Sequence, residues 1–213
     1  MIPPFPMRKL LITLLLLMPL CASATGTPFS DVPPNFPYAQ AITNLASNGV
    51  ISGYSDGTFR PENPINRAEF TKIVTLYKFG ADMVEKCGSH MQFSDLLFDA
   101  WYGKYICRAK DAHLIDGYPD GTFRPAQNIN FSEAAKIIAL TATLNAGDPI
   151  LPSDDGGPWY SRYVRFLSEA HAIPTSIKSL DQVITRGEMA EMIWRLKDTQ
   201  RNLPSNTYNN LTN

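Results

Sequence analysis

The chain has 213 residues, of which 44% are hydrophobic and 18% are charged, and its formal net charge is −1. This composition is typical of a folded domain of ordinary size and excludes a disordered chain. The balance of charge provides no broad basic field, so it gives no indication of nucleic-acid binding.

The first 24 residues have the three parts of a secretory signal peptide. Arg8 and Lys9 form a short positive region, an apolar run extends from Leu10 to Leu20, and Ala22-Ser23-Ala24 is a small-residue cleavage site. The apolar run is too short for a comfortable membrane-spanning helix. We therefore expect residues 1–24 to be a removed signal peptide, and the remainder to be exported without a membrane span.

The cysteines fit an exported protein. Cys21 raises the alternative of a lipid anchor, but a lipobox has a small residue before its cysteine and Leu20 is not small. If Cys21 leaves with the signal peptide, Cys87 and Cys107 remain, and two cysteines in an exported chain favour a disulfide. Two unpaired thiols are the alternative. The three histidines are not at ligand spacing, so no metal site is expected.

A helix, a loop and a second helix are predicted after a Pro-rich lead-in. Tyr38–Asn48 has one apolar face and is followed by a glycine, which predicts the first helix. Asp56-Gly57 is typical of a tight turn. The second helix is predicted from Arg67 to about Phe79, with Asn66 and Glu69 forming a capping box at its start.

This unit returns twice. Tyr54, Asp56, Gly57, Thr58, Phe59, Arg60 and Pro61 reappear in the same order from Tyr118 to Pro125, and Phe29-Ser30-Asp31 reappears as Phe93-Ser94-Asp95. A third copy is degraded: Trp159-Tyr160 echoes Trp101-Tyr102, and Ile184–Glu188 echoes Ile65–Glu69, but the turn segment is missing. A repeat protein is therefore indicated, with each unit burying its apolar face on a neighbour.

The predicted units are residues 29–79, 93–142 and 153–197, the last degenerate. Residues 198–213 are polar, rich in Asn and without periodicity. We expect them to form a disordered tail.

These motifs resemble the S-layer homology (SLH) family, whose units open on an FSDV-like run, carry a GY-x-DGTF-x-P loop and start a helix at I-T-R-A-E. The resemblance covers about residues 29–197. It implies a mainly α fold in which three tandem helix-loop-helix SLH repeats pack as a pseudo-threefold prism. It also implies a bacterial cell-surface location, at the cell wall or S-layer, with grooves that hold secondary cell-wall polysaccharide, often pyruvylated, or a peptidoglycan-linked polymer.

Arg67 and Arg186 are the candidate ligand-binding residues. Each opens a helix, where free N–H groups and the positive end of the helix dipole favour an anion, and a guanidinium adds a rigid fork for carboxylate or phosphate. The alternative is that each arginine pairs with a carboxylate of a neighbouring unit. The resemblance, in which this arginine contacts the polymer, favours the binding role. The second copy has Phe131 instead, which would stack on a sugar or pack in the core.

No catalytic motif is evident, so we expect neither an enzyme nor a cofactor. Trp101 and Trp159 would suit sugar stacking, but large aromatic residues are more often core residues. The leading hypothesis is a non-catalytic cell-envelope anchoring module, with cell-wall polysaccharide or peptidoglycan as its partner. The alternative is a structural scaffold or protein-interaction module of the cell surface with degenerate grooves, and self-association is left open.

Overall fold

The structure is a computed structural model that describes residues 27–84, 87, 93–97, 99–145, 149–198 and 202–212, so the predicted signal peptide and Cys21 lie outside the described residues. The described part contains seven helices and no strand, which confirms a mainly α fold. None of its helices has the length and hydropathy needed to cross a membrane. The helices are α1 (Ala39–Ser47), α2 (Arg67–Val84), α3 (Gly103–Asp111), α4 (Phe131–Ala142), α5 (Ser161–Glu169), α6 (Arg186–Asp198) and α7 (Tyr208–Thr212).

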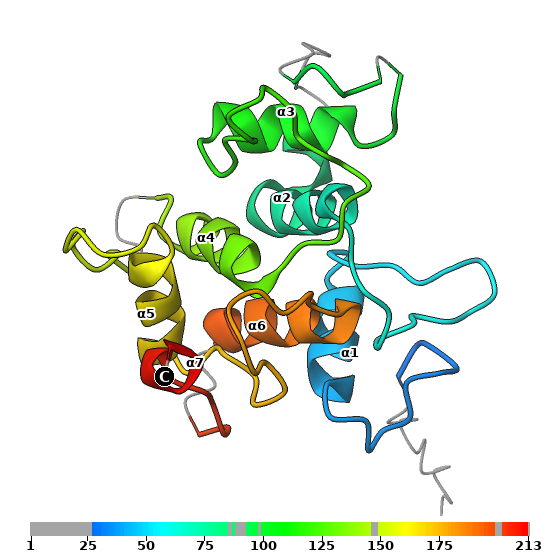
Figure 1. Cartoon of the computed structure of the whole chain (residues 1–213). Helices are drawn as coiled ribbons and strands as arrows, with labels where there is room; N and C mark the ends of the chain where they lie inside the picture. The colour runs from blue at the N-terminus through cyan, green and yellow to red at the C-terminus, as the bar shows by residue number, and fades with distance from the viewer. Residues whose placement is uncertain are drawn as a thin grey trace, which may run out of the picture.

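The six long helices form three pairs, and each pair joins two units. Helix α4 contacts both α2 and α6 at the centre, and α3 packs on α2, α5 on α4, and α1 on α6 (Figure 1). The inner helix of one unit therefore lies beside the outer helix of the next. Because α1 from the first unit packs on α6 from the last, the series of contacts closes into a ring.

Three isoleucines make the same closure with backbone hydrogen bonds. Ile65 donates its N–H to the carbonyl of Ile184 (3.2 Å), Ile184 donates to Ile129 (3.1 Å), and Ile129 donates to Ile65 (3.1 Å). Each isoleucine lies just before an inner helix, and all three side chains are fully buried. This cycle joins the segments that precede the three inner helices, which lie far apart in the sequence, and the pseudo-threefold prism stays a prediction.

The turn segments of the first two units are held by one aspartate each. Asp31 accepts hydrogen bonds from the N–H groups of Phe59 and Arg60 (both 2.7 Å). Asp95 makes the equivalent pair of bonds in the second unit, at 2.7 and 2.6 Å. Gly53 is required beside this contact, since a Cβ there would lie 2.5 Å from the Phe29 ring. The FSD and GY-x-DGTFRP motifs therefore recur together because they bond to each other.

The predicted disorder of residues 198–213 is wrong for the part from 202 to 212. Asn206 donates its backbone N–H to the carbonyl of Ile173 (2.9 Å) and its side-chain amide to that of Ile177 (2.6 Å). Helix α7 then packs on α5, with Leu211 only 9% exposed. The segment thus lies along the third unit where that unit lacks the turn, and its order comes from tertiary partners that periodicity does not reveal.

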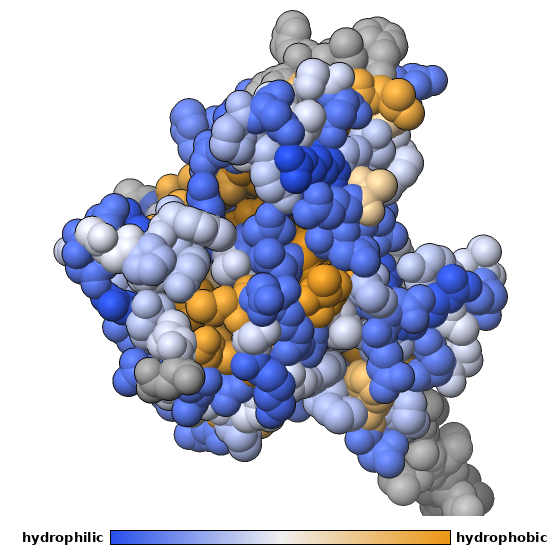
Figure 2. Space-filling view, viewed as in Figure 1, coloured by the Kyte–Doolittle hydropathy of each residue, from blue (hydrophilic) through white to orange (hydrophobic). Residues whose placement is uncertain are grey.

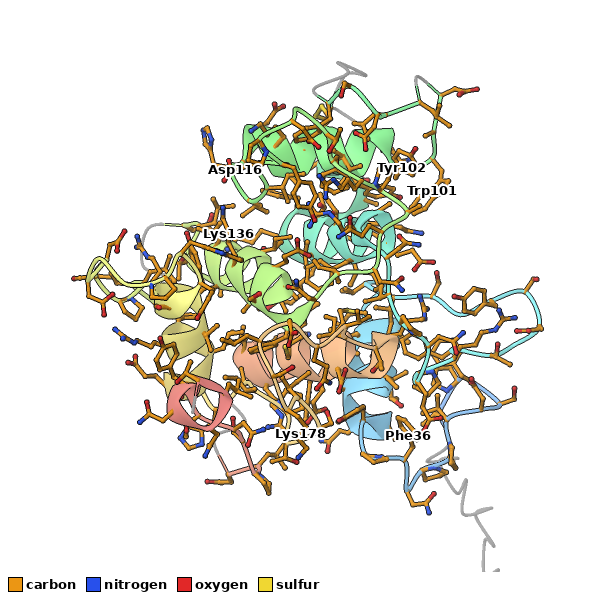
Figure 3. The ribbon with its side chains drawn as sticks, in the orientation of Figure 1. Phe36, Trp101, Tyr102, Asp116, Lys136 and Lys178 are labelled. Atoms are coloured by element: carbon orange, nitrogen blue, oxygen red, sulfur yellow. A yellow bond between two sulfur atoms is a disulfide. The ribbon has the colours of Figure 1, made fainter. Side chains whose placement is uncertain are left out.

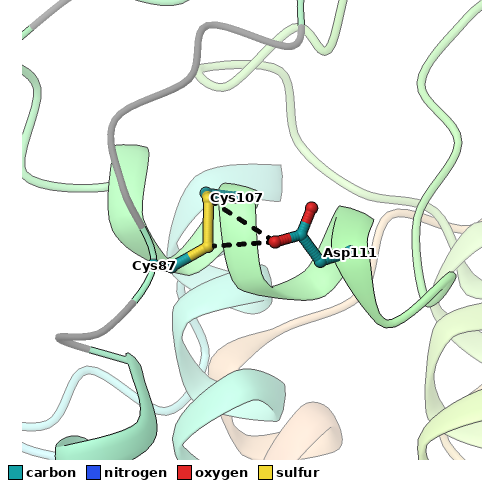
Figure 4. Close-up of side chains that lie close together, drawn as sticks. All are labelled: Cys87, Cys107 and Asp111. Carbon is teal, nitrogen blue, oxygen red and sulfur yellow. Dashed lines mark hydrogen bonds between the residues drawn. A yellow bond between two sulfur atoms is a disulfide. The ribbon is translucent and has the colours of Figure 1, made fainter.

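Cys87 and Cys107 form the predicted disulfide, with an S–S distance of 2.07 Å and a Cα–Cα distance of 6.1 Å (Figure 4). The bond ties the segment after α2 to α3. A carboxylate oxygen of Asp111 lies 3.4 Å from the Cys87 sulfur. The three side chains are close enough to suggest a metal cluster, but both sulfurs are already bonded to each other and offer no thiolate.

Apolar residues on the face seen in Figure 2 gather mainly near its middle, and a smaller apolar group lies at its upper right edge. The buried core is continuous across all three units and includes Ile42, Phe70, Phe123, Phe131 and Ile193. Phe131 is fully buried, so it is a packing residue rather than a surface for stacking on a sugar. The boundaries of the three units remain predictions.

Candidate functional site

The starts of the inner helices are capped as the sequence predicts. Asn66 accepts the N–H of Glu69 (2.9 Å), and the Glu69 carboxylate accepts the N–H of Asn66 (3.4 Å). Asn130 and Glu133 form the same capping box before α4. Thr185 and Glu188 form it before α6, at 2.8 and 3.1 Å.

The free N–H groups expected at these helix starts are not free. The N–H groups of Arg67 and Ala68 bond to the carbonyls of Gln127 (2.9 Å) and Pro125 (3.0 Å) in the second unit. The start of α6 bonds in the same way to Pro61 and Asn63, and that of α4 to Leu180 and Gln182. The first-turn amides therefore join the units, and an anion would have to bind through side chains.

The Arg67 side chain is buried between two units and is only 6% exposed. Its Nε donates to the carbonyl of Phe123 (2.8 Å), and a terminal nitrogen lies 3.5 Å from the Glu133 carboxylate. Its guanidinium lies over the rings of Tyr118 (4.7 Å) and Phe123 (4.8 Å). Arg67 thus makes the contact with a neighbouring unit that we considered as the alternative to ligand binding.

Arg186 repeats this arrangement at the junction of the third and first units. It is also 6% exposed, and its Nε donates to the carbonyl of Phe59 (2.8 Å). A terminal nitrogen donates to the carbonyl of Ser52 (3.4 Å), and the guanidinium lies over the rings of Tyr54 (5.0 Å) and Phe59 (4.6 Å). Both arginines therefore link units.

The same two arginines also border two matched surface grooves, which we name groove A and groove B. Groove A has a volume of about 500 Å³ and groove B of about 440 Å³. Each has a glycine (Gly53 or Gly117) and the tyrosine that follows it from one unit, an arginine from a second unit, and a tryptophan from the third. The matched pairs, groove A first, are Arg186 and Arg67, Lys72 and Lys136, Tyr54 and Tyr118, Glu69 and Glu133, Trp101 and Trp159, and Ser52 and Asp116.

The tryptophans of the two grooves are surface residues. Trp101 is 52% exposed and Trp159 is 55% exposed, so the expectation that they belong to the core is wrong. Each makes an edge-to-face contact with the tyrosine that follows it, at 5.4 and 5.7 Å between ring centroids. A half-exposed indole at the rim of a groove presents an apolar face to a ligand, as sugar rings require.

Lys72 and Lys136 bring an ammonium group to each groove, and the sequence analysis did not identify them. Each stands three residues after the capping glutamate, so their equal place in the repeat was the signal. The Lys136 ammonium bonds to Asp116 at 2.9 Å, and Figure 3 shows the two side chains facing each other from α4 and the segment before it. In groove A the Lys72 ammonium lies 5.7 Å from the Trp101 ring.

The carboxylate and the tyrosine of groove B are bonded to each other. The Tyr118 hydroxyl donates to Glu133 at 2.6 Å. Burial, and then this bond, raise the pKa of Tyr118. Tyr118 is therefore neutral near pH 7, and groove B presents a fixed, preorganised wall beside Arg67.

The third place in the ring has different chemistry. Phe131 stands where the grooves have arginine, and Glu191 stands where they have lysine. Glu191 is buried, bonds to Arg195 at 2.7 Å, and has its pKa raised by burial. Ser176 replaces the groove tyrosine and is bonded to both Tyr38 and Glu188. The polar groups here satisfy one another, so this place does not reproduce the chemistry of grooves A and B.

Comparison with known proteins identifies two of the repeats. Residues 28–71 and 93–135 match the model of the S-layer homology domain. The chain is 32% identical over 145 residues to Cell surface glycoprotein 1 and 35% identical over 116 residues to the Cellulosome-anchoring protein, both of Acetivibrio thermocellus, matches that cover 63% and 52% of this chain. It is also 27% identical over 161 residues, 74% of its length, to an uncharacterized cell wall amidase of Bacillus anthracis.

These relatives are much longer than the matched part. The chain spans only 6%, 25% and 29% of their respective lengths. The similarity is thus one of shared modules, and the two matched segments include the glycine, tyrosine and glutamate positions of grooves A and B. Two segments of the chain, residues 28–71 and 93–135, are therefore S-layer homology repeats.

Proposed function

We propose that this chain is a non-catalytic anchoring module of the cell surface, which binds a cell-wall glycan in grooves A and B. The observation that carries the proposal is the duplicated set of side chains. Each groove combines an arginine, a lysine and a half-exposed tryptophan at matched positions. An apolar ring beside two cations suits a sugar that carries a carboxylate or phosphate.

The relatives point in the same direction. One of them is named for anchoring the cellulosome and another for the cell surface. A secondary cell-wall polysaccharide, pyruvylated or otherwise anionic, or a peptidoglycan-linked polymer is the ligand class that we infer. The described acidic side chains of the grooves are engaged: Glu133 in a capping box and with Tyr118, Glu69 in a capping box, and Asp116 with Lys136. This supports a binding rather than a catalytic role.

Lysine and tryptophan variants give the clearest test, because these side chains are partly exposed and the arginines are structural. Wild-type protein should sediment with purified sacculi and lose this binding once the secondary polymer is chemically removed. Lys72→Ala and Lys136→Ala should each weaken their own groove about two- to fivefold, because ion pairs near a surface contribute about 0.2–1 kcal/mol. Trp101→Ala and Trp159→Ala should also reduce sedimentation.

Lys197→Ala is the matched control, because it removes the same charge outside both grooves, where it bonds to Asn44. A quadruple variant combines Lys72→Ala, Lys136→Ala, Trp101→Ala and Trp159→Ala. The proposal fails if wild-type protein does not bind sacculi, or if the quadruple variant, still folded by circular dichroism, binds as well as the wild type.

A scaffold role is the second candidate, and one observation favours it. Arg67 and Arg186 use their side-chain hydrogen bonds to join neighbouring units. At the equivalent position beside α4 and α6, Phe131 and Glu191 stand instead of cations. Under this alternative the ring presents a surface to another protein or to a second copy. It would be supported by sacculus binding that persists in the quadruple variant after removal of the polymer.

A further inference from the structure

One position differs in charge between the two otherwise matched grooves. The residue before Gly53 in groove A is Ser52, and the residue before Gly117 in groove B is Asp116. Both residues occupy the same place relative to the tyrosine that follows the glycine. The aspartate therefore adds a negative charge to groove B at a position where groove A has a neutral hydroxyl.

In groove B, Asp116 is an exposed anion that holds the lysine. Its side chain is 60% exposed, and its carboxylate lies 2.9 Å from the Lys136 ammonium and 3.7 Å from the Lys110 ammonium. The hydrogen bond from Lys136 is the main cause of its lowered pKa, so Asp116 is ionised at neutral pH. An incoming carboxylate would lie beside this charge and would compete with it for Lys136.

In groove A, the described residues provide no such carboxylate for the lysine. The Lys72 ammonium lies over the rings of Trp101 (5.7 Å) and Tyr105 (5.8 Å), and within the described part of the chain no carboxylate pairs with it. The other charged groups lining this groove are Arg186 and Glu69. Two cations therefore face one acid that already serves in a capping box.

We propose that Ser52 and Asp116 set the charge selectivity of the two grooves: groove A prefers a sugar that bears a carboxylate, whereas groove B takes neutral and anionic sugars about equally. This rests on the proposed function, because it treats both grooves as sugar sites. The physical reason is local. A carboxylate in groove A gains Lys72 without a competitor, whereas in groove B it must displace Asp116 and then remain close to it.

The test uses two probes that differ only in charge, methyl β-D-glucuronide and methyl β-D-glucoside, titrated into the isotope-labelled protein. The backbone amides of Gly53 and Gly117 report on grooves A and B. In the wild type, the glucuronide should bind more tightly than the glucoside at Gly53 and about equally at Gly117. A preference of roughly two- to fivefold is expected, because ion pairs near a surface contribute about 0.2–1 kcal/mol each.

Reciprocal variants move the charge from one groove to the other. Ser52→Asp should abolish the preference at Gly53 and leave Gly117 unchanged. Asp116→Ser should create a preference at Gly117 and leave Gly53 unchanged. Asn209→Asp, on the exposed surface of α7, adds the same charge as Ser52→Asp far from groove A and should change neither.

The inference is overturned if both grooves show the same charge preference in the wild type, or if neither reciprocal variant changes it. It is also overturned if neither sugar perturbs either glycine. None of these outcomes depends on sacculus binding, which tests the proposed function separately. If the protein binds sacculi but the reciprocal variants leave the sugar preference of both grooves unchanged, the chain is an anchoring module whose grooves are not distinguished by charge.

Discussion

At the scale of single residues, the cations of each groove have separate structural situations. Arg67 is buried and bonded to a carbonyl of the next unit, whereas the Lys136 side chain is 28% exposed and is bonded to Asp116 at the surface. Loss of the arginine leaves the buried Phe123 carbonyl without its side-chain donor and removes the cation beside the Glu133 carboxylate, which keeps its bonds to Tyr118 and Asn130. Loss of the lysine leaves only exposed groups, which water can solvate.

Urea unfolding should therefore separate the two cations. Arg67→Ala should lower the free energy of unfolding by about 2 kcal/mol, because unpaired buried polar groups cost about 1–3 kcal/mol. Arg67→Lys should recover little, since an ammonium cannot supply the planar fork. Lys136→Ala should change the free energy by less than about 0.5 kcal/mol. Equal losses for Arg67→Ala and Lys136→Ala would contradict this division.

The turn aspartates give a second prediction at this scale, on pH. Hydrogen bonds from the hydroxyl of Thr122, then from Arg124, hold the pKa of Asp120 at about 2, and those from Thr58 and Arg60 do the same for Asp56. Because the folded pKa lies below the ordinary value of 3.8, the contribution to stability is present above that value. It is lost as the pH falls toward 2.

Carboxyl carbon shifts should show both aspartates titrating near pH 2, and stability should fall between about pH 4 and pH 2. The double variant Asp56→Asn and Asp120→Asn should be less stable at neutral pH and should show a shallower fall. If both carboxyl groups titrate near 4 in the folded protein, the bonds to threonine and arginine do not persist in solution.

At the scale of elements, the helices could be predicted because their sequences recur in the repeats. The C-terminal segment could not, because its sequence does not recur. The capping box of Asn66 and Glu69, and the echo of Ile65–Glu69 in Ile184–Glu188, placed the starts of α2 and α6 correctly. The C-terminal segment has no equivalent in the other units, so its order was missed. It depends on Ile173 and Ile177, which lie far away in sequence.

The groove residues were only partly predictable, for a similar physical reason. Arg67 and Arg186 were found because each is the first residue of a predicted helix. Lys72 and Lys136 were missed because a lysine on a helix face is usually an ordinary solvent-exposed residue. The rim position of Trp159 depends on how the third unit packs on the second, which no local pattern encodes. Neighbouring units thus decide which side chains meet.

Helix α7 is predicted to stabilise the third unit. Leu211→Ala should lower the free energy of unfolding by about 2 kcal/mol, the low end for removing a buried leucine side chain, because α7 is short and can adjust. Asn209→Ala, on the exposed side of the same helix, should have an effect below about 0.5 kcal/mol. Thermal melts of both variants measure the difference. Equal melting temperatures would mean that α7 is not docked on α5.

At the scale of the whole molecule, the ring makes each groove a product of all three units. Groove A takes its turn from the first unit, Trp101 from the second and Arg186 from the third, and groove B permutes the same contributions. No unit alone can therefore assemble a groove. Ring closure depends on the seam between the first and third units, where α1 meets α6.

Gly187 provides a direct way to strain that seam. A Cβ at this position would lie 2.8 Å from the Tyr38 ring and 3.0 Å from the Pro61 carbonyl, which also accepts the Gly187 N–H at 2.8 Å. The backbone of Pro61 cannot move away without breaking that bond. Gly187→Val should therefore lower the free energy of unfolding by about 1–3 kcal/mol, as overpacking typically does. Gly103→Val is the matched control, because a Cβ at Gly103 meets nothing within 4 Å.

The decisive readout is how far this strain spreads. If the three units fold as one cooperative ring, Gly187→Val should speed amide hydrogen exchange in α4, which contacts neither Tyr38 nor Pro61, as much as in α1. This follows because opening the seam between the first and third units breaks the hydrogen bond from Ile65 to Ile184. The two remaining bonds of the isoleucine cycle then no longer form a closed ring. Faster exchange confined to α1 and the start of α6, with α4 unchanged, would instead establish that the seam opens locally and that the second unit is stable on its own.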